Sequence, residues 1–275
     1  MVFQNKRPVG RSPRSALMWV VVGNTMAARC VGGTVIDPVQ SEPYPLRKAR
    51  VGGKEVPMIP MLVPQCPDPL VCVEVKGDPV VLKDGSHGKA CGDLRCQAPW
   101  PLRWKDMEKR YLVLGIKSRG AEVNIVPGRV KWLKEGKLKV GWKVIEFERL
   151  IWTAPYPYLA SLLGLPSPKW KEATVALFSS EAEWSLAYHL ADSNPFYSIL
   201  RVGEVTWALG PGTFDALSAV KHLERKGYLK LKGNIVSYVI DYYALEEYEP
   251  SPPKWVELLG RTAEWKEKSL IETIC

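Results

Sequence analysis

The residues best suited to chemistry in this 275-residue chain are four cysteines that lie close together. They are Cys66, Cys72, Cys91 and Cys96, with His87 between the two pairs. Four thiolates can hold a structural zinc ion, but here five and four residues separate the members of each pair, and zinc ligands are usually closer. The sequence leaves three alternatives open: disulfides, a structural zinc site, or buried free thiols.

A second candidate overlaps the first cysteine pair. In "CPDPLVCVEVKGD", Glu74 and Lys76 lie on an apolar strand, and residues 67–76 resemble the core of the PD-(D/E)xK nuclease family. In that family carboxylates hold Mg²⁺ and a lysine assists the attacking water, so the resemblance implies metal-dependent phosphodiester cleavage. Asp68 is too close to Glu74 for an intervening hairpin, and Asp37 is the other candidate for the family's earlier aspartate. The alternative is an ordinary Glu–Lys pair on a strand surface.

No further catalytic set is found. The three histidines are too few and too scattered for a hydrolase triad, and we expect His189 to be structural. No glycine-rich phosphate loop precedes a helix. We therefore expect no catalytic residues and no cofactor, apart from a structural zinc ion if the cysteines bind one.

The stretch "ALSAVKHLERKGYLKLKGNIVSYVI" predicts a helix that is capped at Thr213 and ends at Gly227, followed by a hairpin that turns at Gly233 and Asn234. Two helices are expected before it. One starts at Ser180, in a capping box with Glu183, and a shorter one covers residues 201–210.

Three helices followed by a hairpin resemble the winged helix-turn-helix family over residues 180–242. The resemblance implies that a recognition helix and its wing contact DNA, with Phe214, Leu217, Val220 and Leu223 facing the core. The candidate DNA contacts on this helix and wing are Ser218, Lys221, His222, Arg225, Lys230, Lys232 and Asn234. Winged helices also serve as protein-docking modules, and the acidic segment after Ile240 opposes DNA contact.

A second basic surface is expected on a hairpin with a turn at "KEGK". It carries Lys131, Lys134, Lys137 and Lys139 beside Trp132 and Trp142. Cations next to aromatic rings suit nucleic acid, through phosphate attraction and base stacking. The alternative is that the tryptophans fill the core while the lysines line a solvated face.

Charge is unevenly divided along the chain. The net charge is +9, with +12 in residues 1–150 and −3 in residues 151–275. A basic half indicates a polyanionic partner. Gln and Asn together number only 9, a composition typical of hyperthermophiles, whose cytosol tolerates disulfides.

Hydrophobic periodicity predicts an α+β protein with an N-terminal β-rich domain and a C-terminal winged helix domain followed by a helical tail. The expected organisation is a basic arm at 1–15, a basic β-rich domain at 16–152, a linker with a short helix at 153–179, a winged helix domain at 180–245 and a helical tail at 246–275.

The sequence therefore predicts a non-enzymatic, cytoplasmic or virion DNA-binding protein of a hyperthermophilic archaeon or its virus, with double-stranded DNA as the expected partner and no membrane partner. A structural virion protein and a metal-dependent nuclease are the alternatives. Trp255, Leu258, Leu259 and Trp265 of the tail could pair two protomers or fold back on their own domain.

Overall fold

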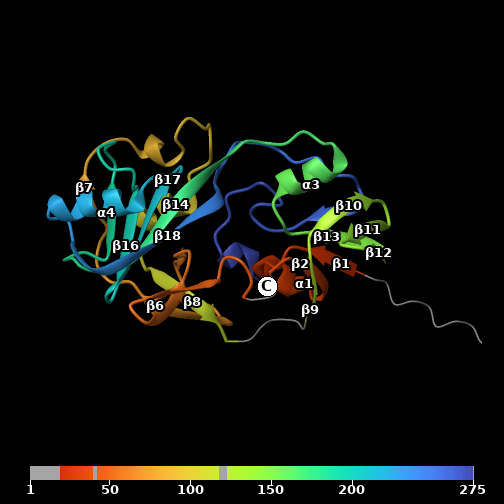
Figure 1. Ribbon diagram of the computed structural model, residues 1–275, viewed down its shortest axis with the longest axis horizontal. Helices are drawn as coiled ribbons and strands as arrows, with labels where there is room; N and C mark the ends of the chain where they lie inside the picture. The colour runs from red at the N-terminus through yellow and green to blue at the C-terminus, as the bar shows by residue number, and fades with distance from the viewer. Residues whose placement is uncertain (1–18, 40–41, 118–122, 275) are drawn as a thin grey trace, which may run out of the picture.

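The computed structural model describes residues 19–39, 42–117 and 123–274. Two sheets lie at opposite ends of the molecule (Figure 1). One is a five-stranded parallel sheet and the other is a six-stranded, largely antiparallel sheet. The chain passes between them several times, so each sheet combines strands that are distant in the sequence.

The parallel sheet contains β1 (Trp19–Val22), β2 (Gly33–Asp37), β9 (Val123–Pro127), β13 (Arg149–Trp152) and β19 (Val256–Leu258), in the order β19-β13-β1-β2-β9. All four neighbouring pairs are parallel. The central strand, β1, is buried on both faces, because Val20 and Val22 join one apolar cluster and Val21 joins another. A continuous apolar run of this kind is typical of a parallel strand.

Three elements cover this sheet. The short helix α1 (Met26–Val31) joins β1 to β2, and α3 (Tyr156–Leu163) follows β13. Between β9 and β13 the chain forms an antiparallel meander of β10 (Val130–Lys134), β11 (Lys137–Val140) and β12 (Lys143–Glu146). The expected turn at "KEGK" is confirmed, since it joins β10 to β11.

The six-stranded sheet has the order β18-β14-β17-β16-β15-β7. Its strands are β7 (Val80–Lys83), β14 (Trp170–Glu181), β15 (Leu186–His189), β16 (Ser198–Val202), β17 (Val205–Pro211) and β18 (Lys230–Leu245). One face packs against α4 (Ala216–Arg225), and the other packs against the segments between β2 and β9. Both faces are therefore buried.

The winged helix prediction and the predicted fold class are wrong, because this region is a sheet with one helix. The helix expected from Ser180 is the end of β14 followed by β15, and the hydroxyl of Ser180 bonds to Thr206 in place of capping a helix. The helix expected at 201–210 is most of the β16–β17 hairpin. Strands buried on both faces lose the apolar–polar alternation by which strands are recognised, and so imitated helical spacing.

The predicted wing is also wrong. Gly233 and Asn234 do not turn the chain, because β18 runs through them and pairs with β14 on both sides. The register shifts here, with Val236 opposite Leu177 and Lys232 opposite Ser179. The φ of +80° at Gly233 fits such a bulge, where glycine is favoured.

The helix α4 is confirmed, although its cap is Asp215 and not Thr213. Val220 and Leu223 are buried against the sheet as predicted. Leu217, which was expected to face the core, is 47% exposed. The helix thus covers a sheet and is not the recognition helix of a winged helix domain.

Most of the remaining elements pack against one face of the six-stranded sheet. A β-hairpin and a three-stranded sheet pack there with short helical turns. These elements are β3 (Lys48–Val51), β4 (Lys54–Pro57), β5 (Leu62–Val63), β6 (Leu70–Glu74), β8 (Tyr111–Ile116), η1 (His87–Ala90), α2 (Trp100–Arg103), η2 (Trp104–Asp106) and η3 (Ile271–Thr273).

The C-terminal tail folds back on its own chain. Trp265 is buried, and Trp255, Leu258 and Leu259 pack against the apolar clusters around the parallel sheet. Among the described residues, no helix combines the length and apolarity needed to cross a membrane.

Lys89 clamps the loop after β15 onto η1. Its Nζ donates to the carbonyl oxygens of His189, Ala191, Asn194 and Phe196 at 2.5–3.0 Å. Four carbonyl dipoles pointing at one ammonium group give charge-assisted bonds, which are stronger than neutral ones.

We predict that Lys89→Met lowers the free energy of unfolding by about 2–3 kcal/mol, because the carbonyls lose a charged donor. Urea denaturation followed by circular dichroism measures this. Lys83→Met, at an exposed position of β7, is the matched control and should change stability little. Equal stability of the two variants would contradict a stabilising role for the four hydrogen bonds of Lys89.

Candidate functional site: the carboxyl edge of the parallel sheet

The strand order of the parallel sheet defines where a ligand site is expected. Counted along the chain, its strands have the order 3-2-1-4-5, with the first strand in the centre. The connections leave β1 toward β2 on one side and later return to β13 on the other side. In open sheets of this kind, ligands bind outside the carboxyl ends of the strands at this reversal point.

A cavity of about 300 Å³ lies at this edge, and we call it the switch-point cavity. Its volume is at the lower end of the range for small-molecule sites. Residues that follow β1, β2 and β13 form one wall, and residues of β18 form another. Its lining includes Gly23, Thr25, Asp37, Tyr44, Arg47 and Asp241.

Gly23 allows β1 and β13 to approach closely at the carboxyl edge. Its φ is +105°, and a Cβ atom there would lie 2.7 Å from the amide nitrogen of Ala154 and 2.8 Å from Oγ1 of Thr153. Thr153 in turn donates its hydroxyl to the carbonyl oxygens of Val22 and Gly23. No other residue would fit this turn without moving β13.

The turn after Gly23 leads into α1. Oγ1 of Thr25 accepts from the amide of Ala28, and the amide of Met26 donates to the carbonyl oxygen of Tyr44 at 3.2 Å. Within the described part of the chain, the amides of Thr25 and Ala27 donate to no protein group. Two amide donors at this turn are therefore available to an acceptor.

Charged side chains of both signs line the cavity. Both carboxylate oxygens of Asp37, at the end of β2, accept backbone amides at 2.7 Å, from Asn24 and from Val39. Arg47 makes no side-chain hydrogen bond or ion pair with any described residue, and its Nε is buried. Partial burial raises the pKa of Asp241, and the Glu172 carboxylate raises it further.

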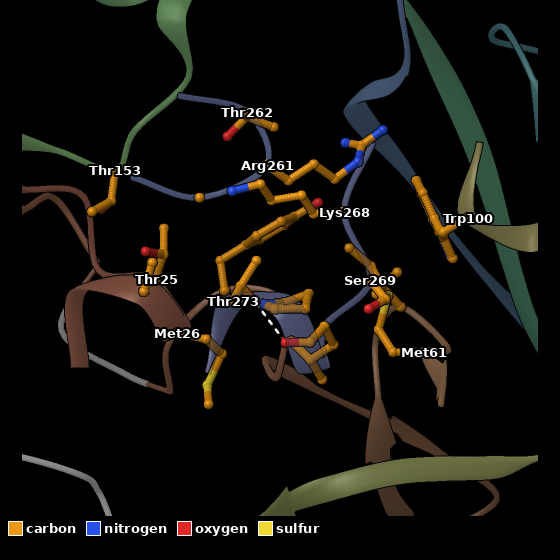
Figure 2. A pocket seen from close by; sticks show the side chains of 16 residues that line it. Thr25, Met26, Met61, Trp100, Thr153, Arg261, Thr262, Lys268, Ser269 and Thr273 are labelled. Atoms are coloured by element: carbon orange, nitrogen blue, oxygen red, sulfur yellow. Dashed lines mark hydrogen bonds between the residues drawn. The ribbon is translucent and has the colours of Figure 1, made fainter. Parts of the chain in front are cut away.

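A second, smaller cavity of about 70 Å³ adjoins the first (Figure 2). The two cavities share Thr25, Tyr44 and Pro45 as lining residues. In Figure 2, Arg261 and Lys268 lie between Thr25 on one side and Trp100 on the other. Its volume is too small for an organic ligand, so the switch-point cavity is the candidate site.

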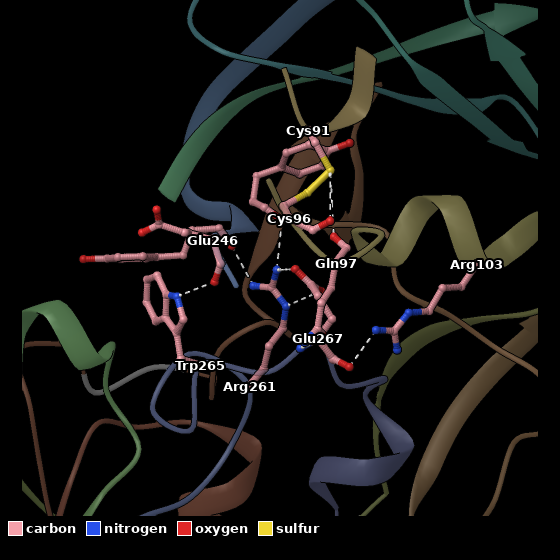
Figure 3. A network of polar contacts seen from close by, with 10 residues as sticks. Cys91, Cys96, Gln97, Arg103, Glu246, Arg261, Trp265 and Glu267 are labelled. Carbon is pink, nitrogen blue, oxygen red and sulfur yellow. Dashed lines mark hydrogen bonds and ion pairs between the residues drawn. A yellow bond between two sulfur atoms is a disulfide. The ribbon is translucent and has the colours of Figure 1, made fainter. Parts of the chain in front are cut away.

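Arg261 holds the wall of the second cavity together (Figure 3). Its guanidinium bonds both carboxylate oxygens of Glu267, at 2.9 and 2.5 Å, and donates to the carbonyl oxygens of Tyr242 and Tyr243. It also lies 5.2 Å from the ring of Trp100. Burial raises the pKa of Glu267, and the Arg261 charge opposes that rise.

The residues predicted to contact DNA do not form one surface. Of those on α4, Ser218 donates to Asp215, its own helix cap. On β18, Lys232 forms an ion pair with Glu181. One group of candidates lies on α4 and β18, at the six-stranded sheet: Ser218, Lys221, His222, Arg225, Lys230, Lys232 and Asn234. The other group lies on the meander at the other end of the molecule (Figure 1): Lys131, Lys134, Lys137 and Lys139.

The tryptophans of the meander do not fill the core. Trp132 is 41% exposed and Trp142 is 94% exposed. The interpretation that placed them inside is therefore wrong. Lys134 and Lys139 lie over these two rings, at 5.1 and 5.9 Å from their centroids.

The cysteines form disulfides and not a zinc site. Cys66 pairs with Cys72, and Cys91 pairs with Cys96. Within the described ranges, no group of three or more His, Cys, Asp or Glu side chains could hold a metal ion. This also removes the metal site that the nuclease resemblance implied for Asp68 or Asp37 with Glu74.

The segment "VVVGNTMAARCVGGTVID" carried a signal that sequence reasoning missed. It is an apolar strand, a tight turn, a short helix and a second strand that ends in Asp37. Dinucleotide-binding turns have three glycine positions, and here the second holds Thr25 and the third Ala28. With one glycine left, the turn lacks the pattern by which such turns are recognised.

Comparisons with known proteins find similar folds among solved structures. No protein-family model and no curated protein matches the sequence. Three solved structures are similar to this chain. An oxidoreductase from Methanosarcina mazei has a TM-score of 0.62 at 9% identity, with 93% of this chain and 97% of that chain covered. A fatty acid isomerase from P. acnes that produces CLA has a TM-score of 0.64 at 7% identity, with 96% and 97% covered. Xcc4156, a flavin-dependent halogenase from Xanthomonas campestris, has a TM-score of 0.52 at 12% identity, with 94% and 68% covered.

These similarities agree with the class of fold that the structure shows: a parallel sheet joined to a second, mainly antiparallel sheet. The predicted DNA-binding and virion functions rested on a winged helix domain, and they are overturned. Residues 180–242 form part of a sheet with one helix, and proteins of other kinds share the fold over nearly the whole chain. The fold does not support the expectation that no cofactor is used, because one of the proteins that share it is flavin-dependent.

We predict that Arg261→Ala lowers the free energy of unfolding by about 3–5 kcal/mol, because the buried Glu267 carboxyl and the carbonyl groups of Tyr242 and Tyr243 would lose their charged partner. Thermal and urea denaturation measure this. Arg50→Ala is the matched control, since Arg50 pairs with Glu55 on the surface and such pairs contribute less than about 1 kcal/mol. If Arg261→Ala lowers the free energy of unfolding no more than Arg50→Ala does, the contacts of Arg261 do not stabilise the fold.

Proposed function

We propose that this protein binds the nucleotide part of a flavin dinucleotide in the switch-point cavity and uses the flavin in an oxidation–reduction reaction. The observation that carries the proposal is the position of the cavity. It lies at the carboxyl ends of β1, β2 and β13, where the strand order reverses, in a fold that a flavin-dependent enzyme shares.

The residues around the cavity fit the ribose and phosphate parts of such a ligand. Asp37, at the end of β2, has the position and the acceptor oxygens that suit ribose hydroxyls. The amide of Thr25 and the guanidinium of Arg47, both from residues that line the cavity, are donors without protein partners among the described residues, and a pyrophosphate needs such donors.

The turn departs from the usual glycine pattern in one respect. Thr25 replaces the glycine that lets the backbone approach the pyrophosphate. The Thr25 side chain is turned to α1, where it caps the helix. Its hydroxyl is therefore engaged within the protein, which leaves the neighbouring amides as donors.

A flavin supplies the ability to accept or release a pair of electrons with a proton. In this proposal the chain's own residues bind and orient it. Asp37 and Arg47 hold the polar end, and the apolar side chains of Met58, Ile59 and Ile240 exclude water from the cavity wall. The close packing at Gly23 keeps these groups at fixed positions.

We predict that the purified protein binds FAD, that ADP competes with it, and that Arg47→Ala weakens FAD binding about tenfold, because a desolvated charge contact to phosphate is lost. Quenching of flavin fluorescence on titration measures the affinity. Lys48→Ala removes a neighbouring cation that does not line the cavity, and it should bind FAD as the unaltered protein does.

Two outcomes would contradict the proposal. One is the absence of FAD binding to folded protein. The other is binding that ADP does not reduce and that Arg47→Ala leaves unchanged, since the nucleotide would then lie outside the switch-point cavity.

We retain the cytoplasmic location as part of the proposal. The low Gln and Asn content is typical of hyperthermophiles. The cytosol of these organisms tolerates disulfides such as Cys66–Cys72 and Cys91–Cys96, so the disulfides are compatible with a cytoplasmic location.

A further inference from the structure

The β10–β12 meander has one buried face and one face that nothing in the described chain covers. Val130, Leu133, Leu138 and Val140 point into the apolar cluster that also holds β13 and α3. The opposite side contributes nothing to this core. The side chains there are therefore free of any packing role in the fold.

The outward side chains form an ordered row across the three strands. Lys139 on β11 lies opposite Trp132 on β10 and opposite Val144 on β12. Trp142 follows in the turn between β11 and β12. We call Lys131, Trp132, Lys139, Trp142 and Val144 the meander face; together with Gly141 they surround an open hollow of about 500 Å³.

The apolar members of the meander face are strongly exposed. Trp142 is 94% exposed, Val144 56% and Trp132 41%. Keeping a valine and two indoles in water is unfavourable by roughly 25 cal/mol for each Å² of apolar surface. Neighbouring exposed apolar residues of this kind mark interaction sites.

The charge of this region is positive. Residues 130–148 contain five lysines and three glutamates. One glutamate, Glu146, is neutralised by an ion pair with Lys137 at 2.6 Å. The ammonium groups of Lys134 and Lys139 lie over the exposed rings, so cation and indole are presented together.

We propose that the meander face docks onto the surface of an anionic lipid bilayer. Indole rings prefer the boundary between headgroups and acyl chains, and lysine stems can lie along apolar surface while their ammonium groups reach the anionic headgroups. A bilayer boundary accepts Trp142, Val144 and Lys139 at the same time. A nucleic acid could stack on the indoles and bind the lysines, but it would leave Val144 in water.

The position of the meander agrees with such docking. The meander lies at the end of the molecule that holds the parallel sheet, away from the six-stranded sheet and α4 (Figure 1). Attachment would therefore be peripheral, through one small face, and would hold the six-stranded sheet away from the bilayer. The inference does not rest on flavin binding, because none of the five residues lines the switch-point cavity.

The test uses the full chain and two kinds of vesicle, one of phosphatidylcholine alone and one of equal parts phosphatidylcholine and phosphatidylglycerol. Co-sedimentation should show binding to the anionic vesicles at least about tenfold tighter than to the neutral ones, and added salt should weaken it. Trp142→Ser with Val144→Ser, and separately Lys131→Glu with Lys139→Glu, should each weaken it about tenfold.

Val81→Ser with Lys230→Glu is the matched control, since it removes an equally exposed valine and an exposed lysine from the other sheet. This variant should bind the anionic vesicles normally. Circular dichroism and thermal melting check that every variant folds. The inference is overturned if the folded protein ignores anionic vesicles, if it binds neutral ones equally well, or if the meander variants bind like the control. Binding of an oligonucleotide or an acidic peptide in place of vesicles would also overturn it.

Discussion

The buried ion pair between Arg261 and Glu267 joins three parts of the chain that are far apart in the sequence. Arg261 follows the last strand of the parallel sheet, and its guanidinium reaches the end of β18 in the other sheet and the ring of Trp100 in α2. Glu267 is fully buried and also accepts Arg103 at its carbonyl oxygen. One guanidinium thus fixes the two sheets relative to each other.

The switch-point cavity depends on this arrangement, because its walls come from both sheets. Gly23, Asp37 and Thr153 belong to the carboxyl edge of the parallel sheet, while Val239 and Asp241 belong to β18. The end of β18 that forms the wall is the segment whose carbonyl groups Arg261 binds. Under the proposed function, the contacts that stabilise this arrangement would also hold the walls of the ligand site in place.

Part of this structure could be predicted from the sequence. The C-terminal end of α4 follows from the glycine after an amphipathic helix, and the β10–β11 turn follows from a short polar segment between two strands. The sheet around α4 could not be predicted, because strands such as β15 are buried on both faces and lose their alternation. The interpretation that placed Trp132 and Trp142 in the core was wrong for a different reason. In a short strand, the sequence does not distinguish an apolar residue that faces the core from one that faces solvent.

The candidate site was missed because its signal is spread over the whole chain. The five strands of the parallel sheet come from residues 19–22, 33–37, 123–127, 149–152 and 256–258, and no local pattern predicts their association. The local turn at Gly23 retains a single glycine, and its remaining glycine positions hold Thr25 and Ala28. Asp37 was considered only as a metal ligand, a role for which the described structure offers no partner residues.

The central claim is that the carboxyl edge of the parallel sheet holds a flavin nucleotide. A crystal structure of the protein grown with FAD tests it most directly. The account predicts ribose density at Asp37 and pyrophosphate density beside Thr25 and Arg47. Well-ordered protein with FAD bound elsewhere, or with the switch-point cavity free of nucleotide at saturating FAD, would contradict it.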